Sequence, residues 1–278
     1  MKYIVTGAEG FAGKAIIKYL EKKKIDVIGI SKKNNKKNIF KHNLEKPFPK
    51  DFLNKNMEID TIIHTAAYHK LDDFKLLPKA KSEKNQKMVK NLLQLCKKKK
   101  IEKIIFFSTI DISYGDLNNK KKKFYNISKL KSETYLKKNF QKGLLKKLII
   151  LRLPAIIGKN CNKNFLSNLT RDLKENKKVK IWRHNQPYNN LIHINDICKL
   201  IFYLLTKNFN SIKIFNCLAS KPISLTTVFS IFKRKLKSKS KSEIVLTKKN
   251  FHKKMTRGTF FKFMTVSKSL DLYLRDTL

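Results

Sequence analysis

The chain of 278 residues carries 64 Lys and Arg residues against 20 Asp and Glu residues, a formal net charge of +44. This length is enough for one α/β domain with a smaller appendage, and no apolar run reaches the roughly 18 residues of a membrane span. Because the first predicted strand begins at residue 2, no secretory signal peptide fits before it, and a cytoplasmic protein without a membrane partner is expected.

The positive charge raises the question of a nucleic-acid partner, because Lys and Arg neutralise phosphate groups. Only six of the 64 basic residues are Arg, and Lys, Asn, Ile and Phe are abundant along the whole chain while Ala, Gly and Pro are scarce. Such a bias is typical of AT-rich coding. The lysine runs at 97–100 and 120–123 fall at a predicted helix end and in a predicted loop, where they are solvated. No nucleic-acid partner is therefore predicted.

Four cysteines lie far apart within apolar segments and form no C-x-x-C pair. This pattern is typical of reduced thiols that pack in a core, and no metal site is predicted. The four are Cys96, Cys161, Cys198 and Cys217.

The first functional signal is the succession of a strand, a glycine loop and a helix at the start of the chain. Residues 2–6 are an apolar, β-branched run, and residues 14–20 place apolar side chains at helical spacing. Between them, Gly7 permits a turn, Gly10 lets the backbone approach a phosphate, and Gly13 lets the helix pack closely on the strand. Because a pyrophosphate needs backbone N–H groups at a helix N-terminus with no side chain in the way, this stretch predicts a nucleotide site.

The Thr-Gly-Ala-x-Gly-Phe-x-Gly stretch at residues 6–13 resembles the extended short-chain dehydrogenase/reductases, the NAD-dependent epimerase/dehydratase family. The resemblance implies an α/β fold with a doubly wound parallel (Rossmann) sheet. It implies an NAD(P)-binding domain over residues 1–157, with residues 190–218 returning to its sheet, and a mainly substrate-binding region over residues 158–278. The loop residues that it places against the cofactor are Gly7, Gly10, Phe11 and Gly13.

The second predicted strand, residues 25–30, ends where the adenosine ribose of the cofactor binds in such folds. An acidic residue commonly accepts hydrogen bonds from the ribose there, but this chain has Ser31, Lys32 and Lys33. Cations suit a 2′-phosphate better than a bare ribose, so this tip favours NADP(H) over NAD(H). The resemblance adds two contacts on the adenine side, Asn43 and Leu44.

A third predicted strand, residues 60–65, runs into Ala66 and Ala67 and is similar to the family's Asp-x-Val-Ile-His-x-Ala-Ala. Small residues here let the backbone approach the phosphates and the nicotinamide ribose of the cofactor. His64 is predicted to pack at the strand end rather than to transfer protons. The next predicted helix, residues 81–98, carries on one face Met88, Leu92, Leu95 and Cys96.

The predicted chemistry lies in the next strand and helix. The strand at residues 103–107 ends at Ser108 and Thr109, and Tyr125 and Lys129 open the following helix. Tyr and Lys four residues apart lie on one helix face, so the ammonium can lower the pKa of the phenol from about 10 towards the working range. In the resemblance, Tyr125 is the general acid/base and Lys129 also holds the nicotinamide ribose, while a hydroxyl from the strand polarises the substrate oxygen.

That hydroxyl is predicted to be Thr109, with Ser108 as the alternative. Family members carry Ser-Ser-x-x-Val-Tyr-Gly or Thr-Asp-Glu-Val-Tyr-Gly here. Residues 108–115 instead read Ser-Thr-Ile-Asp-Ile-Ser-Tyr-Gly, which is one residue longer between the hydroxyl and the Tyr-Gly pair. Counting from the strand selects Thr109, whereas counting back from Tyr114 reaches Ile110, which has no hydroxyl.

Later segments resemble the substrate-binding region of the family. Residues 148–154 predict the sixth strand, and residues 191–196 are similar to the family's Ile-His-Val-x-Asp, in which His193 and Asp196 are predicted to be structural. Sugar-nucleotide epimerases often carry an Arg that clamps the diphosphate, and the matching position here holds Asn. The residues predicted to contact the substrate are this Asn189 and, as substitutes for the clamp, Arg183 and Arg257.

The resemblance implies an NAD(P)-dependent enzyme of polysaccharide biosynthesis that acts on a nucleotide sugar by hydride transfer, with a homodimer left open. Epimerase and 4-ketoreductase activity are predicted about equally. The family contains more epimerases, whereas the cations that follow Ser31 at the end of the second predicted strand favour a reductase that uses NADPH. Elimination is disfavoured, since dehydratases need an acid/base pair after Thr109 and only Asp111 is present. The alternative is a non-catalytic Rossmann-like module that binds RNA or senses NADP, in which Tyr125 and Lys129 would have no purpose.

Overall fold

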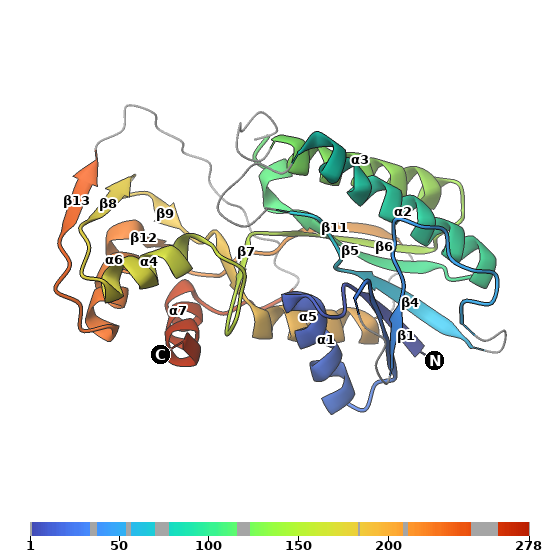
Figure 1. The fold of residues 1–278 in the computed structure, drawn as a ribbon, viewed down its shortest axis with the longest axis horizontal. Helices are drawn as coiled ribbons and strands as arrows, with labels where there is room; N and C mark the ends of the chain where they lie inside the picture. Colours follow the sequence, from blue (N-terminus) through green and yellow to red (C-terminus); the bar gives the residue numbers. More distant parts are fainter. Residues whose placement is uncertain are drawn as a thin grey trace. The chain divides into compact units, whose positions relative to one another are not determined.

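Seven parallel strands form one sheet in the computed structural model, which describes residues 2–33, 38–53, 57–69, 78–115, 123–182, 184–207, 211–245 and 261–277. The strand order is β11-β6-β5-β4-β1-β2-β3, so the chain winds outwards in both directions from β1 and β4 (Figure 1). The strands are β1 (Lys2–Thr6), β2 (Val27–Ser31), β3 (Ile39–Lys41), β4 (Ile59–His64), β5 (Lys103–Thr109), β6 (Lys147–Leu153) and β11 (Ile212–Asn216). This order confirms the predicted doubly wound sheet.

Helices cover both faces of this sheet (Figure 1). Two of them, α2 (Lys79–Lys99) and α3 (Lys123–Gln141), lie on one face, and α1 (Phe11–Lys22) and α5 (Ile194–Thr206) lie on the other. Strands covered on both sides read as continuous apolar runs rather than alternating ones. The neighbours Ile62 and Ile63 in β4 are accordingly both fully buried. A short 3₁₀ turn, η2 (Ile110–Ile112), follows β5.

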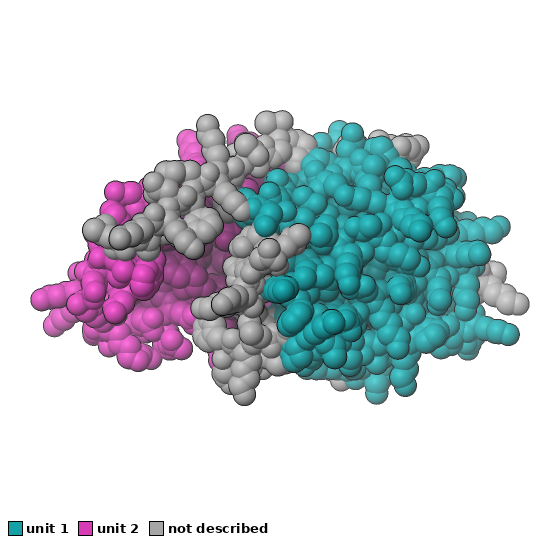
Figure 2. Space-filling model, turned by 90° about the horizontal axis from the view of Figure 1, so that it is seen from above, with its two compact units in different colours: residues 1–153, 197–216 teal, residues 154–196, 217–278 magenta. Residues whose placement is uncertain are grey.

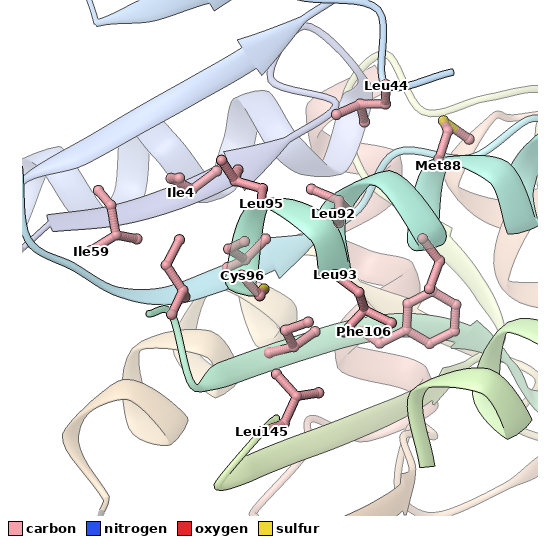
Figure 3. Close-up of a cluster of buried hydrophobic side chains, with 14 of the residues drawn as sticks. Ile4, Leu44, Ile59, Met88, Leu92, Leu93, Leu95, Cys96, Phe106 and Leu145 are labelled. Atoms are coloured by element: carbon pink, nitrogen blue, oxygen red, sulfur yellow. The ribbon is translucent and has the colours of Figure 1, made fainter. Parts of the chain in front are cut away.

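The main hydrophobic core lies between α2 and the sheet (Figure 3). The buried face of α2 includes Met88, Leu92, Leu95 and Cys96, as the helical spacing predicted. These side chains pack with Ile4 of β1, Phe106 of β5 and Leu44 of the loop after β3. Each large apolar side chain buried in this way contributes about 1.5–3 kcal/mol.

The chain divides into two compact units (Figure 2). One comprises residues 1–153 and 197–216, and the other comprises residues 154–196 and 217–278. The sequence had placed this boundary after residue 157 and the returning segment at 190–218. The first unit ends earlier because the segment after β6 forms β7 (Ala155–Ile157), which pairs with β10 (Leu191–His193) and not with the seven-stranded sheet.

The second unit is built from short strand pairs and three described helices. β8 (Val179–Trp182) pairs in parallel with β13 (Ser242–Val245), and β9 (Pro187–Tyr188) pairs antiparallel with β12 (Ile223–Ser224). The helices are α4 (Phe165–Lys174), α6 (Leu225–Lys235) and α7 (Val266–Thr277). Their shared core includes Leu169, Phe232 and Leu270. Asn164 caps α4, because its side chain accepts hydrogen bonds from two backbone N–H groups of the first turn.

Among the helices of the described ranges, none combines the length and the apolar character that crossing a membrane requires. The same part of the chain holds no group of three His, Cys, Asp or Glu side chains arranged to bind a metal ion. The four cysteines all lie among the described residues, and none of them takes part in a disulfide bond.

Candidate active site

The glycine loop between β1 and α1 is a close backbone turn. Gly7 has a φ of +69°, a conformation that strains residues with a side chain. Gly10 N donates to Gly7 O over 2.8 Å. A Cβ on Gly13 would lie 2.2 Å from Gly7 O, whereas a Cβ on Gly10 would meet only Gly7 O, at 3.1 Å. Of the three glycines, Gly10 is therefore the least crowded, and Gly13 is needed for packing.

Helix α1 begins directly after Gly10, and its first amides have no side-chain cap. The first N–H groups of a helix lack intrahelical partners and carry the positive end of the helix dipole. Phe11, the first helical residue, is half-buried beside this end. An anion such as a pyrophosphate fits a helix start of this kind.

Gly29 in β2 is a residue of this site that the sequence interpretation missed. A Cβ there would lie 2.8 Å from Ala8 Cβ and 3.0 Å from Ile39 Cγ1, so only glycine lets the loop settle on β2. Ala8 N donates to Ile30 O over 3.1 Å, which holds the loop in that place. The sequence contains a signal for this residue, because a glycine inside an apolar strand often marks a place where another backbone segment approaches the strand closely.

Ala66 and Ala67 follow β4 on the other side of the glycine loop. Ala66 N donates to Thr6 Oγ1 over 3.3 Å. A Cβ on Gly7 would lie 3.0 Å from Ala66 N, so the two backbone segments are in close contact. The predicted pair of small residues is thus placed beside the predicted phosphate loop.

His64 at the end of β4 is a buried packing residue. Its Nδ1 lies 2.7 Å from Thr6 Oγ1, and its ring stacks on Phe106 with the centroids 5.7 Å apart. Burial, together with the positive charge of Lys129, lowers the pKa of His64 to about 3. The imidazole is therefore neutral at working pH and holds Thr6 against the loop.

A carboxylate that the sequence interpretation missed lies at the tip of β2. Ser31 is buried, and its Oγ donates to Glu9 Oε2 of the glycine loop over 2.5 Å. Lys32 and Lys33 follow it as exposed residues. A carboxylate can accept a hydrogen bond from a ribose hydroxyl and repels a phosphate, so Glu9 opposes the two lysines at this tip.

A second carboxylate at this tip, Glu45, is paired with Lys32. Lys32 Nζ donates to Glu45 Oε1 over 3.2 Å and to Tyr68 OH over 3.0 Å, while Lys84 Nζ lies 3.0 Å from Glu45 Oε2. Burial acts to raise the pKa of Glu45, but hydrogen bonds from Tyr68, Lys84 and Lys32 hold it at about 2. Glu45 is therefore ionised, and any anion bound by Lys32 competes with it.

The predicted adenine-side residues lie in the loop after β3. Leu44 is buried, and its carbonyl accepts a hydrogen bond from Asn91 Nδ2 of α2 over 2.8 Å. Asn43 Oδ1 accepts from the backbone N of Glu45 over 3.2 Å. Both contacts order the loop that carries the ionised Glu45.

Tyr125 and Lys129 occupy successive turns at the start of α3. Lys129 Nζ lies 6.0 Å from the centre of the Tyr125 ring. Lys129 is 2% exposed, its Nζ donates to Phe107 O over 2.7 Å, and the same nitrogen lies 4.7 Å from the centre of the Phe106 ring. The structure thus brings the predicted acid/base and its cation together on one helix face.

The protonation of this pair depends on burial. Burial lowers the pKa of Lys129 to about 7, and the negative charge of Glu133 opposes this shift. Burial also raises the pKa of Tyr125, and the charge of Asp111 raises it further. The direction for Tyr125 is opposite to the predicted one, because burial and the charge of Asp111 raise its pKa although Lys129 lies on the same helix face.

The two candidate hydroxyls at the end of β5 have different partners. Thr109 Oγ1 accepts from Asp111 N over 3.3 Å and donates to Asp111 Oδ2 over 3.2 Å. Ser108 Oγ donates to Glu133 Oε1 over 2.6 Å. The side chain of Ile110 is buried at 2% exposure. Ser108 therefore makes the shorter hydrogen bond, to a buried carboxylate, and Thr109 the longer one.

Most of the predicted site segments share one edge of the sheet. The glycine loop follows β1, Ser31 ends β2, Ala66 follows β4 and Thr109 ends β5. In a parallel sheet these carboxyl ends lie at the same edge, and ligands bind there where the strand order reverses. The reversal here lies between β1 and β4.

Of the three predicted substrate residues, the structure describes only Asn189. Asn189 is buried at 4% exposure in the second unit, and its carbonyl accepts from Leu191 N over 2.7 Å. Arg183 and Arg257 lie outside the described residues. His193 Nδ1 accepts from Asn195 N over 3.2 Å inside the second unit, where this imidazole is fully buried.

Two comparisons of sequence bear on this site. A model of the NAD dependent epimerase/dehydratase family matches residues 3–217. The ADP-L-glycero-D-manno-heptose-6-epimerase of Brachyspira hyodysenteriae is 27% identical to this chain over 267 residues, which are 85% of this chain and 82% of that protein.

Solved structures with the same fold include two 4-epimerases. The UDP-N-acetylglucosamine 4-epimerase of Methanobrevibacter ruminantium M1, in complex with UDP-N-acetylmuramic acid, has a TM-score of 0.77 at 19% identity, with 99% of this chain and 97% of that chain covered. The UDP-glucuronic acid 4-epimerase of Bacillus cereus, in complex with NAD, has a TM-score of 0.75 at 19% identity, with 99% and 98% covered. At these identities the likeness establishes the fold.

Proposed function

The chain belongs to the NAD dependent epimerase/dehydratase family, and from this we propose that it binds a nicotinamide dinucleotide and epimerises a nucleotide sugar by reversible hydride transfer. The observation that carries the proposal is the pairing of Tyr125 with the buried Lys129 Nζ, 6.0 Å from its ring. A bound dinucleotide would supply the hydride acceptor and donor. The glycine loop, least crowded at Gly10, and the uncapped start of α1 fit its pyrophosphate.

In this proposal each residue has one task. Tyr125 Oη takes the proton from the sugar hydroxyl at the carbon that is oxidised and returns it after reduction. Lys129 provides the positive charge that stabilises the phenolate, and its ammonium also holds the nicotinamide ribose. Thr109 Oγ1 donates to the same substrate oxygen and keeps it within reach of Tyr125. Ser108 is kept as the alternative donor.

Epimerisation is favoured over reduction by the relatives, since the similar proteins described above are named as epimerases. Dehydration is disfavoured because Asp111 is the only carboxylate in η2. The direct test is mass spectrometry of the small molecules retained by the native protein, followed by assay on 4-keto and 4-hydroxy nucleotide sugars. An epimerase interconverts two sugars without net consumption of reduced cofactor, whereas a reductase consumes it in proportion to product.

We propose further that NADP(H) binds more tightly than NAD(H). Lys32 and Lys33 follow β2 as exposed cations, and a charge-assisted contact between such a cation and a 2′-phosphate contributes about 1.5–3 kcal/mol, roughly one to two decades in affinity. Because Lys32 already pairs with Glu45 and Glu9 lies beside Ser31, we expect the lower end of that range.

Calorimetric titration with NADPH and NADH tests this preference. The double variant Lys32→Ala/Lys33→Ala should lose about tenfold in NADPH affinity and leave NADH affinity unchanged. Glu9→Gln should act in the opposite direction, because it removes a carboxylate that repels the 2′-phosphate. A wild type that prefers NADH, or an unchanged ratio in the lysine double variant, contradicts the NADP proposal.

The buried cation makes a prediction about stability. Lys129→Met should raise the free energy of unfolding below about pH 7, although it should lower both turnover and cofactor affinity. The pKa of Lys129 is about 7 in the folded chain, against 10.5 for an exposed lysine. Between these values the unfolded chain binds more protons, so wild-type stability rises with pH. The variant lacks this rise, and its advantage should therefore shrink as the pH increases from 7 to 10.5.

Denaturant unfolding at about pH 6 and about pH 9 measures this difference. Lys131→Met is the matched control, because Lys131 is an exposed residue of the same helix. If Lys129→Met changes stability equally at both pH values, Lys129 does not titrate as a buried base.

A further inference from the structure

Glu133 is a buried carboxylate to which the proposed chemistry assigns no task. It lies on α3, four residues after Lys129, and is 0% exposed. Arg152 of β6 donates to it twice, from Nη2 to Oε2 over 2.7 Å and from Nε to Oε1 over 3.1 Å. A two-point contact between guanidinium and carboxylate fixes direction as well as distance.

This ion pair is bonded to both ends of the turn that follows β5. At one end, Ser108 Oγ donates to Glu133 Oε1 over 2.6 Å. At the other end, Arg152 Nη1 donates to Ser113 Oγ over 3.1 Å, and Ser113 Oγ donates to Asn216 Oδ1 of β11 over 2.6 Å. The contacts therefore tie α3, β6 and β11 to one short segment.

That segment, residues 108–113, is called the catalytic turn here because it carries Thr109. We propose that the Glu133–Arg152 pair positions the catalytic turn and engages the Ser108 hydroxyl, so that Thr109 is the residue that donates to the substrate oxygen. This inference rests on the proposed function. Glu133 and Arg152 are positioning residues, since they act through the turn and do not touch the reacting atoms.

Stability alone does not account for the pair. The free energy needed to desolvate two buried charges is about as large as the free energy gained from their attraction. Apolar residues of similar size therefore often give the same stability at a buried position. The hydrogen bonds to Ser108 and Ser113 give the pair a directional role that apolar residues lack. The positions of the two serines, one before and one after η2, fix both ends of the turn.

The serine at the strand end is also unsuited to polarise a substrate. Its single hydroxyl hydrogen points to Glu133 Oε1 over 2.6 Å, and Glu133 cannot turn away while Arg152 holds both carboxylate oxygens. Thr109 donates to Asp111 over the longer distance of 3.2 Å. A substrate oxygen displaces this second hydrogen bond more readily than the first.

Two variants of the pair and one control test the inference. Arg152→Lys keeps the charge but loses the planar fork that reaches Glu133 and Ser113 together. Glu133→Gln/Arg152→Gln removes both charges, so that neither remains buried without its partner. Glu102→Gln is the matched control, because Glu102 forms a surface ion pair with Lys146 over 2.8 Å. Unfolding temperatures identify which variants are folded.

Steady-state rates on nucleotide sugars and titrations with NAD and NADP provide the readout. In Arg152→Lys and in the double variant, kcat should fall about tenfold or more, while KM for the sugar and the dissociation constant of the cofactor stay within about twofold. Ser108→Ala should add nothing to the loss in the double variant, because the two changes act on one contact. Glu102→Gln should match the wild type.

Wild-type kcat in the folded variants overturns the positioning role. The same conclusion follows if kcat and cofactor affinity fall together, since a general loss of structure would then explain both. A wild type that binds the cofactor but turns over no sugar contradicts the proposed function and this inference with it. Wild-type turnover with unaffected variants contradicts only the inference.

Discussion

Tyr125→Phe is expected to lower turnover about 10²–10⁴-fold, with cofactor affinity nearly unchanged. Phe keeps the ring that lies 6.0 Å from Lys129 Nζ but has no proton to transfer. Burial and the charge of Asp111 raise the pKa of Tyr125, so the phenolate that accepts the proton of the sugar hydroxyl has to form against this shift. The loss should appear in kcat rather than in KM.

The measurement is the steady-state rate on a panel of 4-keto and 4-hydroxy nucleotide sugars. Tyr135→Phe is the matched control, because Tyr135 is an exposed tyrosine of the same helix, 37% accessible. Thr109→Val should also lower turnover, and Ser108→Ala should have the milder effect. Activity near the wild-type level in Tyr125→Phe would mean that the Tyr-x-x-x-Lys spacing is a coincidence, and the catalytic proposal would be wrong.

Gly10→Val is expected to abolish dinucleotide binding, a loss of at least about 100-fold in affinity or roughly 2.7 kcal/mol. A Cβ at Gly10 would meet Gly7 O at 3.1 Å, a tight contact that a shift of a few tenths of an ångström relieves, whereas at Gly13 the corresponding distance is 2.2 Å. The methyl groups of the valine would occupy the space in front of the first amides of α1, where a pyrophosphate has to approach.

Gly13→Ala is the informative contrast to Gly10→Val. A Cβ at Gly13 would lie 2.2 Å from Gly7 O, so this smaller substitution should destabilise the fold itself. Calorimetric titration and thermal unfolding of both variants separate the two effects. Equal cofactor affinity in wild type and in a folded Gly10→Val variant would show that the glycine loop is not the cofactor site.

The sequence by itself determined the order of the elements and the local signals of function. Gly7 and Gly10 lie within one turn, and Tyr125 and Lys129 lie four residues apart in one helix. The geometry of such groups follows from the backbone of a single element, because neighbours in a helix or a tight turn meet whatever the rest of the chain does. The apolar face of α2 was predictable for the same reason.

The tertiary structure alone decided which polar partners these groups have. Ser31 donates to Glu9, Lys32 pairs with Glu45, and Ser108 donates to Glu133 across 25 residues of sequence. In a chain with 64 Lys and Arg residues, each carboxylate has many possible cationic partners, and the spacing of residues along the sequence does not show which of them it contacts. The packing of β-strands and helices does select, because it sets each carboxylate beside particular donors, as it sets the fully buried Glu133 beside Ser108 and Arg152. The end of the first unit at Leu153 has a similar cause, since the pairing of β7 with β10 joins segments more than thirty residues apart.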